Sequence, residues 1–250
     1  MRYEAYMDDV ALSSLNPAIR ILNIEPTEPQ YNTNFANRAN RDGAMIIRRS
    51  KATEGVQITL EIHEYNPQKR EEIAQQISSW ANGRVLKTSD RSGKRLRVVC
   101  DRYPIVTARD WTDPVTVVFT AYNLPHWEED TPALLTLTGT STSGQLFVPG
   151  NAGDALVEVS IKANAAATNI TLRVGSTILG LGGLSLAAND TITIDYDDNL
   201  ILRIRKGNTS ILNKRTGADD LLARSGEYNT VEIAADGSVT ATFSTRGLWH

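Results

Sequence analysis

The sequence has one cysteine, few aromatic residues (6%) and a net charge of only −3 over 250 residues. A single thiol, Cys100, cannot form an intramolecular disulfide, and its apolar strand setting is typical of a small core residue. The small net charge provides no basic field for nucleic acid. No apolar run approaches the roughly 18–20 residues of a membrane span, and the first residues lack a signal peptide's apolar segment. We therefore expect a soluble protein made in the cytoplasm, without membrane insertion.

Residue patterns that would indicate a metal site are also missing. His63, His126 and His250 are scattered without the paired spacing of zinc ligands. Asp195, Asp197 and Asn199 mimic the first three ligands of a calcium loop. However, Leu200 stands where that loop needs glycine, and Lys206 where it needs a bidentate glutamate. The sequence therefore predicts a hairpin turn here and no bound metal.

Glycine-rich segments in the second half fail as catalytic motifs. Leu179–Gly183 has no following Lys-Ser/Thr and no helix to present its N-terminus to a phosphate. Gly183–Ala187 lacks the last glycine of a nucleophile elbow, and the only later histidine is His250. We expect no catalytic site and no cofactor, so the chain is not predicted to be an enzyme.

The clearest structural signal runs from Gly55 to Gly83. Apolar and polar residues alternate from Val56 to Ile62, which is the pattern of a strand with one buried face. Asn66-Pro67 can start a helix, since Asn caps free N–H groups and Pro fits the first helical position. An apolar stripe follows at Ile73, Ile77, Trp80 and Ala81. We predict one amphipathic helix against a sheet, with Gly83 as its left-handed stop.

Two segments around this unit carry many polar residues. Glu25–Gly43 is rich in Pro, Asn and Arg, and we expect an irregular stretch that is either a partner-ordered loop or a surface loop. Arg84–Lys87 and Leu96–Cys100 flank a turn cluster at Ser89–Gly93, which predicts a basic β-hairpin that faces solvent or a neighbouring subunit. Val115–Ala121 alternates and predicts another strand.

The acidic, proline-terminated segment Glu128–Pro132 is the best domain boundary. We therefore predict domains at residues 1–130 and 131–250. Short strands at close spacing, separated by turns such as Asp197–Asn199 and Asp236-Gly237, favour an antiparallel β-sandwich in the second domain. The expected strands are Leu134–Leu137, Leu156–Ile161, Ile170–Val174, Thr191–Ile194, Leu200–Ile204, Val231–Ile233 and Val239–Phe243.

Several short motifs follow one another in a fixed order along both halves of the chain. The first half has the turn Arg41-Asp42-Gly43, the strand and helix at 55–83, Asp101-Arg102-Tyr103, and the segment Leu124-Pro125-His126-Trp127-Glu128. The second half has the segments 188–195 and 225–231 and a final strand that runs to Trp249. Over nearly the whole chain, this order resembles the distal tail protein (Dit) family of long-tailed, non-contractile bacteriophages and related prophages.

The resemblance implies a mainly β fold. Its α+β N-terminal domain would form rings from a small sheet or β-sandwich with one amphipathic helix and a β-hairpin, and its C-terminal domain would be a galectin-like antiparallel β-sandwich. It also implies a structural virion protein at the distal end of the tail, with six copies in a ring between the tail tube and the tail-tip hub or baseplate. The implied partners are the chain itself, the tail tube protein and the hub or tail-associated protein, with receptor-binding proteins as a further candidate. DNA would pass through the lumen without specific binding.

The resemblance assigns no residue-level site, so the interface residues come from the sequence itself. Because Glu25–Gly43 and the basic hairpin have too little apolar content to be ordered by their own domain, we expect them to form the subunit faces. The candidate interface residues are Arg38, Arg41, Arg91, Lys94 and Arg95. The alternative function is a carbohydrate-binding module that attaches the tail to cell-wall sugars. Its candidate aromatic residues are Phe147, Tyr196, Tyr228, Phe243 and Trp249.

Overall fold

The computed structural model describes residues 3–37, 44–105 and 113–250. The chain separates into two compact units, Met1–Trp127 and Glu128–His250. Strands dominate both units, and the described residues include a single α-helix, α1 (Pro67–Ala81). The predicted mainly β class is therefore confirmed. No helix in the described residues is long and apolar enough to cross a membrane.

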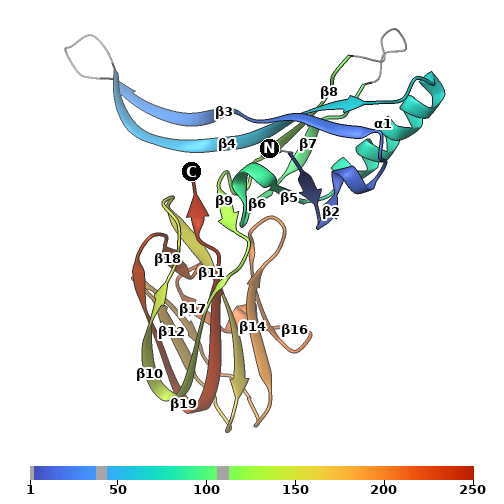
Figure 1. Ribbon diagram of the computed structural model, residues 1–250. Helices are drawn as coiled ribbons and strands as arrows, with labels where there is room; N and C mark the ends of the chain where they lie inside the picture. Colours follow the sequence, from blue (N-terminus) through green and yellow to red (C-terminus); the bar gives the residue numbers. More distant parts are fainter. Residues whose placement is uncertain (1–2, 38–43, 106–112) are drawn as a thin grey trace. The chain divides into compact units, whose positions relative to one another are not determined.

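The first unit consists of two small antiparallel sheets and α1 (Figure 1). One sheet has the order β3-β4-β8-β7, and the other contains the run β2-β1-β5-β6. The strands are β1 (Ala5–Met7), β2 (Val10–Ala11), β3 (Ile19–Asn37), β4 (Ala44–Ile62), β5 (Val85–Thr88), β6 (Lys94–Arg97), β7 (Val99–Arg102) and β8 (Val115–Ala121), with 3-10 turns η1 (Leu12–Ser14) and η2 (Ser89–Arg91). β9 (Trp127–Glu129) begins at the last residue of the unit.

The strand and helix expected at 55–83 are confirmed. Val56, Ile58, Leu60 and Ile62 of β4 are all buried. At the start of α1, the Asn66 side-chain oxygen accepts hydrogen bonds from the backbone N–H groups of Gln68 and Lys69. The predicted apolar stripe is buried, and the Trp80 ring meets Phe119 of β8 edge to face at 6.0 Å between centroids. The helix therefore packs on the sheet through its apolar face, as periodicity predicted.

The predicted role of Gly83 is wrong. It does not adopt the left-handed conformation, and neither does Asn82, the residue that follows the last helical residue Ala81, since its φ is −75°. A Cβ on Gly83 would lie 2.2 Å from Cγ of Met7 in β1. The glycine is needed because the chain passes very close to β1, rather than because the backbone turns left-handed.

The irregular stretch expected at Glu25–Gly43 is also wrong for the residues that the structure describes there. Residues 25–37 continue β3, which pairs with β4 from Ile19↔Ile62 to Asn37↔Ala44. Pro26 and Pro29 argued against a strand, because proline has no N–H to donate to a sheet. However, β3 is an edge strand, where a missing N–H is tolerated. Pro29 lies in a register shift between Thr27 and Gln30, the kind of irregularity that accommodates proline.

The basic hairpin is present as β5 and β6, joined through η2. The predicted second strand, Leu96–Cys100, is divided at Val98, and its last residues belong to β7, which pairs with β8 in the other sheet. Cys100 is only partly buried, so the core role expected for it is wrong. Partial burial still raises the pKa of its thiol to about 11, because the thiolate is poorly solvated there.

The second unit is built on a curled, ten-stranded antiparallel sheet (Figure 1). Most of the predicted strands are present, several of them longer than expected, but β15 starts at Leu202 rather than Leu200, and the strands predicted at Val231–Ile233 and Val239–Phe243 are a single strand, β19. The ten strands of the sheet are β10 (Ala133–Phe147), β11 (Asp154–Ala163), β12 (Ile170–Val174), β13 (Thr177–Leu181), β14 (Thr191–Tyr196), β15 (Leu202–Lys206), β16 (Thr209–Ser210), β17 (Arg215–Gly217), β18 (Leu222–Arg224) and β19 (Tyr228–Thr245). The unit also contains the short strand β20 (Leu248–Trp249), which lies outside this sheet, and the 3-10 turn η3 (Leu212–Lys214). Alternating burial along β11 and β14 directs one face of the sheet into the core.

A turn predicted at Asp236-Gly237 is instead part of β19. Residues 231–235 of this strand pair with β12, and residues 239–245 pair with β11, so β19 passes from one half of the curled sheet to the other. At the crossing, Asp236 accepts hydrogen bonds from the backbone N–H groups of Thr168 (2.8 Å) and Asn169 (3.2 Å). A Cβ on Gly237 would lie 2.0 Å from the Ala166 carbonyl oxygen, which explains the glycine.

Candidate assembly surfaces

The longest free edges in the first unit belong to the β3–β4 ribbon. Only Glu54–Leu60 of β4 have a third strand, β8, beside them. Between Ala44 and Thr53, β4 pairs with β3 alone among the described residues, and the ribbon projects from the rest of its unit (Figure 1). Two-stranded ribbons are marginally stable alone, and their unpaired N–H and C=O groups can pair with another chain. This ribbon, residues 27–37 of β3 and 44–53 of β4, is therefore a candidate assembly surface.

The base of the ribbon is marked by a charged pair. The Lys51 ammonium donates to the Glu54 carboxylate, and both side chains are largely buried. Glu54 is also the last β4 residue in register with β8, opposite Ala121. Because charges removed from water must be paired, the two side chains neutralise each other at the end of the three-stranded part of the sheet.

The basic hairpin is ordered by its own unit, contrary to the expectation that it needs a neighbouring subunit. Leu86 of β5 and Leu96 of β6 pair in register and are fully buried. The guanidinium carbon of Arg91 lies 5.0 Å from the centroid of the buried Trp127 ring. Of the predicted interface residues, Arg91, Lys94 and Arg95 are partly buried on this hairpin, whereas Arg38 and Arg41 lie outside the described residues.

A further ion pair holds the hairpin to the start of the chain. Lys87 of β5 contacts the Asp9 carboxylate at 2.7 Å. The Lys87 ammonium, with a smaller contribution from Arg95, holds the pKa of Asp9 below its usual value. The basic side chains therefore have acidic and aromatic neighbours within the unit, which the sequence alone did not reveal.

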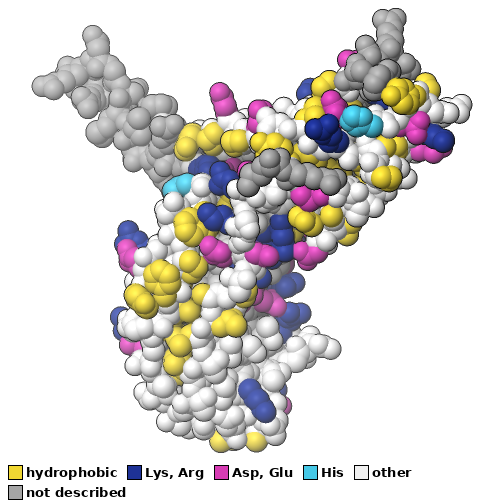
Figure 2. Space-filling view, viewed as in Figure 1, with side chains coloured by type: hydrophobic (Ala, Val, Ile, Leu, Met, Phe, Trp, Pro, Cys, Tyr) yellow, Lys and Arg dark blue, Asp and Glu magenta, His cyan; other side chains and the backbone are white. Residues whose placement is uncertain are grey.

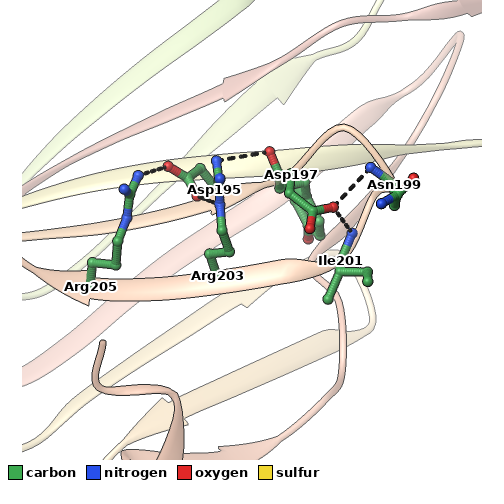
Figure 3. A network of polar contacts seen from close by, with 7 residues as sticks. Asp195, Asp197, Asn199, Ile201, Arg203 and Arg205 are labelled. Atoms are coloured by element: carbon green, nitrogen blue, oxygen red, sulfur yellow. Dashed lines mark hydrogen bonds and ion pairs between the residues drawn. The ribbon is translucent and has the colours of Figure 1, made fainter. Parts of the chain in front are cut away.

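The calcium-like residues form a hairpin turn between β14 and β15, as predicted (Figure 3). The Asp195 carboxylate accepts hydrogen bonds from Arg203 and Arg205, so its oxygens are engaged by cations. The Asp197 carboxylate accepts the backbone N–H groups of Asn199 (2.9 Å) and Ile201 (3.0 Å). Within the described part of the chain, no three His, Cys, Asp or Glu side chains are grouped to hold a metal ion.

One face of the second unit presents hydroxyl groups. Thr136 and Thr242 lie 3.0 Å apart across β10 and β19, and Thr138 and Thr240 lie 3.1 Å apart. In Figure 2 much of the second unit is white, the colour of backbone and of uncharged polar side chains, and positive and negative side chains are interspersed elsewhere. The face shown is therefore polar without a field of one sign.

The five aromatic residues considered for sugar binding have different environments. Phe243 and Tyr196 are buried core residues, and Tyr196 Oη accepts the backbone N–H of Leu221. Trp249 donates from its indole to Glu129 at 2.8 Å. Phe147 and Tyr228 are exposed, and their rings lie 5.0 Å apart. Only this last pair offers an aromatic surface to a ligand.

Comparison with known proteins gives matches in structure only, because no protein-family model and no curated protein sequence matches the chain. The crystal structure of the Dit protein (gp 19.1) of phage SPP1 matches with a TM-score of 0.68 and 12% identity, over 98% of this chain and 99% of that one. The chain has the fold of a phage Dit protein. That SPP1 protein is described as a paradigm of the hub adsorption apparatus in phages that infect Gram-positive bacteria.

Two further matches are chains from the phage p2 baseplate in its activated conformation. The Sr-bound structure gives a TM-score of 0.54 at 12% identity, and the Ca-bound structure gives 0.54 at 11%. Each match covers 98% of this chain and 97% of the baseplate chain. At these identities the likeness establishes the fold but not the function, because one fold can have many functions.

Proposed function

We propose that the chain is a structural component of a phage tail tip, a distal tail protein. The observation that carries the proposal is the extent of the match to SPP1 Dit, which takes in 98% of this chain and 99% of the other. A single sandwich domain hosts many unrelated functions, so its fold alone would say little. A likeness that takes in two different units and nearly the full length of both chains is much narrower.

The finer part of the proposal is a ring of six copies that joins the tail tube to the tail-tip hub. A repeated head-to-tail contact closes into a ring when its rotation returns to the first subunit. The β3–β4 ribbon supports such a contact, because its outer part has no third strand among the described residues. Pairing with a neighbouring subunit would use these free backbone groups.

In this proposal residues 1–130 form the ring, and residues 131–250 form a galectin-like sandwich. Arg38, Arg41, Arg91, Lys94 and Arg95 remain the proposed interface residues. The partners are further copies of the chain, the tail tube protein and the tail-tip hub protein, with receptor-binding proteins as a further candidate. The ring lumen would pass DNA without specific contacts, and the site of action is the distal tail of the virion.

Carbohydrate binding is less well supported as the primary function, because the similar structures are named as a paradigm of a phage hub adsorption apparatus and as a phage baseplate. The two roles can be separated by position and by phenotype. Immunogold labelling with antibody against the purified chain is expected to mark the distal end of tails, with pre-immune serum as the control. Disrupting the gene is expected to give free tail components without complete particles. Normal, fully assembled tails in the mutant would contradict a structural role.

A further inference from the structure

The second unit contains a cleft of about 860 Å³ beside its exposed aromatic pair. Its walls come from the turn between β12 and β13, from β18 and from the start of β19. Gly153 and Asp154, at the start of β11, complete the lining. All of these elements belong to one compact unit, so the cleft is built by a single fold.

Tyr228 forms the aromatic wall of this cleft. Its side chain is 72% exposed, although it is a large ring that folding would normally cover in part. Phe147 lies opposite Tyr228 in the β10–β19 register, and the two rings are tilted by 49° at 5.0 Å. Phe147 thus supports one side of the Tyr228 ring. In the described part of the chain the Tyr228 hydroxyl has no hydrogen bond, so it is available to a ligand.

The charged groups of the cleft are arranged as arginine–carboxylate pairs. Arg173 lies 3.5 Å from Glu232, and Arg224 lies 3.6 Å from Glu227. Asp154 adds one further carboxylate to the lining. Because both signs are present and interleaved, an anionic polymer would meet carboxylates and a cationic one would meet guanidinium groups. The lining therefore favours an uncharged ligand with many hydroxyl groups.

Hydrogen bonds link the segments that form the floor of the cleft. Asn229 is buried, with 6% of its surface exposed, and it links β19 to β18. Its side-chain oxygen accepts the backbone N–H of Arg224 at 2.8 Å, and its side-chain nitrogen donates to the Arg224 carbonyl at 3.0 Å. Thr177 ties the β12–β13 turn to β18 by accepting the Leu222 N–H at 3.1 Å. A preformed floor lowers the ordering cost of binding.

We propose that this cleft binds a neutral saccharide, with Tyr228 as its stacking platform. A pyranose ring has an apolar C–H face, which can cover the exposed face of Tyr228, and a rim of vicinal hydroxyls. Guanidinium and carboxylate groups can bind two neighbouring hydroxyls at once, as donors and as acceptors respectively. A purely apolar peptide would remove these polar groups partly from water and would offer them no hydrogen bonds in return. The inference rests on the second unit and does not depend on ring formation.

The test uses the full-length chain on an array of neutral and acidic glycans, where multivalent display compensates for weak single-site affinity. Neutral glycans that bind are then titrated in solution by NMR. Tyr228→Ala is expected to weaken binding about tenfold, in line with an aromatic contact of roughly 1.5 kcal/mol. Tyr228→Phe is expected to retain most of the affinity, whereas Glu232→Gln is expected to weaken binding by removing a charged acceptor.

Tyr65→Ala is the matched control, because Tyr65 is 74% exposed but belongs to the first unit. It is expected to bind like the unmodified chain. The proposal is overturned if no neutral glycan binds, if only acidic glycans bind, or if Tyr228→Ala binds as well as the control. Ring formation is measured on the same samples, so failure of sugar binding and failure of assembly are seen separately.

Discussion

Arg91 places its guanidinium group over the indole ring of Trp127, with 5.0 Å between the guanidinium carbon and the ring centroid. The arginine comes from η2, and the tryptophan is the last residue of the first unit. This cation–π contact joins two segments that are far apart in sequence. It also gives Arg91 a role within its own subunit, in addition to the interface role proposed for it.

Arg91→Ala is expected to lower the free energy of unfolding of the first unit by about 0.5–1 kcal/mol, the usual range for a partly exposed cation–π contact. Arg91→Lys should lose less, because the cation is kept. Urea unfolding followed by tryptophan fluorescence measures both. Ser92→Ala, an exposed neighbour on the same hairpin, is the control. Equal stability of Arg91→Ala and the control would show that the contact contributes nothing.

Ile77 is the second site at which the first unit can be tested, since it is completely buried in α1. Ile77→Asp places a carboxylate in the core without a partner and is expected to cost about 3 kcal/mol or more. We expect calorimetry to show loss of the first unit's transition and electron microscopy to show no rings.

Gln76→Asp is the matched control for this substitution, because Gln76 is an exposed neighbour on the same helix. It should fold and assemble like the unmodified chain. A soluble Ile77→Asp protein that still forms rings would contradict the role given to the helix.

Asp236 should make the second unit sensitive to acid. Hydrogen bonds from the Thr168 hydroxyl and from the backbones of Thr168 and Asn169 hold the Asp236 pKa well below its ordinary 3.8. A lowered pKa in the folded state means that its contribution is present above about pH 4 and is lost as the pH falls towards the folded-state pKa. Thermal unfolding between pH 7 and pH 2 is therefore expected to show declining stability in this range.

Asp236→Asn separates this residue from the other carboxylates. The variant is expected to be less stable than the unmodified chain at pH 7, because the amide offers one acceptor oxygen in place of two. The difference in stability between the variant and the unmodified chain should become smaller as the pH falls, because acid removes the charge of Asp236 in the unmodified chain. A difference that stays constant down to pH 2 would show that the charge on Asp236 is not what stabilises the crossing of β19.

Local patterns were enough to predict the strand and helix at 55–83. The periodicity, the Asn66 cap and the preference of Pro67 for the first helical position depend only on residues close in sequence. They can therefore be recognised without knowledge of the tertiary structure. The same is true of the turn at Asp197, where a side chain binds the backbone of its own loop. The Gly83 prediction failed because its close neighbour, Met7, is distant in sequence.

Residues whose structure depends on distant pairing were harder to predict. Residues 25–37 have no clean alternation, and two prolines interrupt them, so only the pairing with β4 identifies them as a strand. Asp236-Gly237 has the composition of a turn, but pairing on both sides keeps it within β19. The cleft beside Tyr228 combines four separate segments, and no local motif marks it.

The central claim is that copies of this chain assemble through the β3–β4 ribbon, and shortening the ribbon tests it most directly. Tyr31 and Lys51 are in register, so residues 32–50 can be replaced by Asn-Gly, the preferred two-residue hairpin turn, and Lys51 stays beside Glu54. Sedimentation velocity and negative-stain images of both proteins at the same concentration then report assembly. We predict rings of six 27.4 kDa chains for the full-length protein and folded single chains for the shortened one. A full-length protein that stays monomeric, or a shortened one that forms the same rings, would contradict the account.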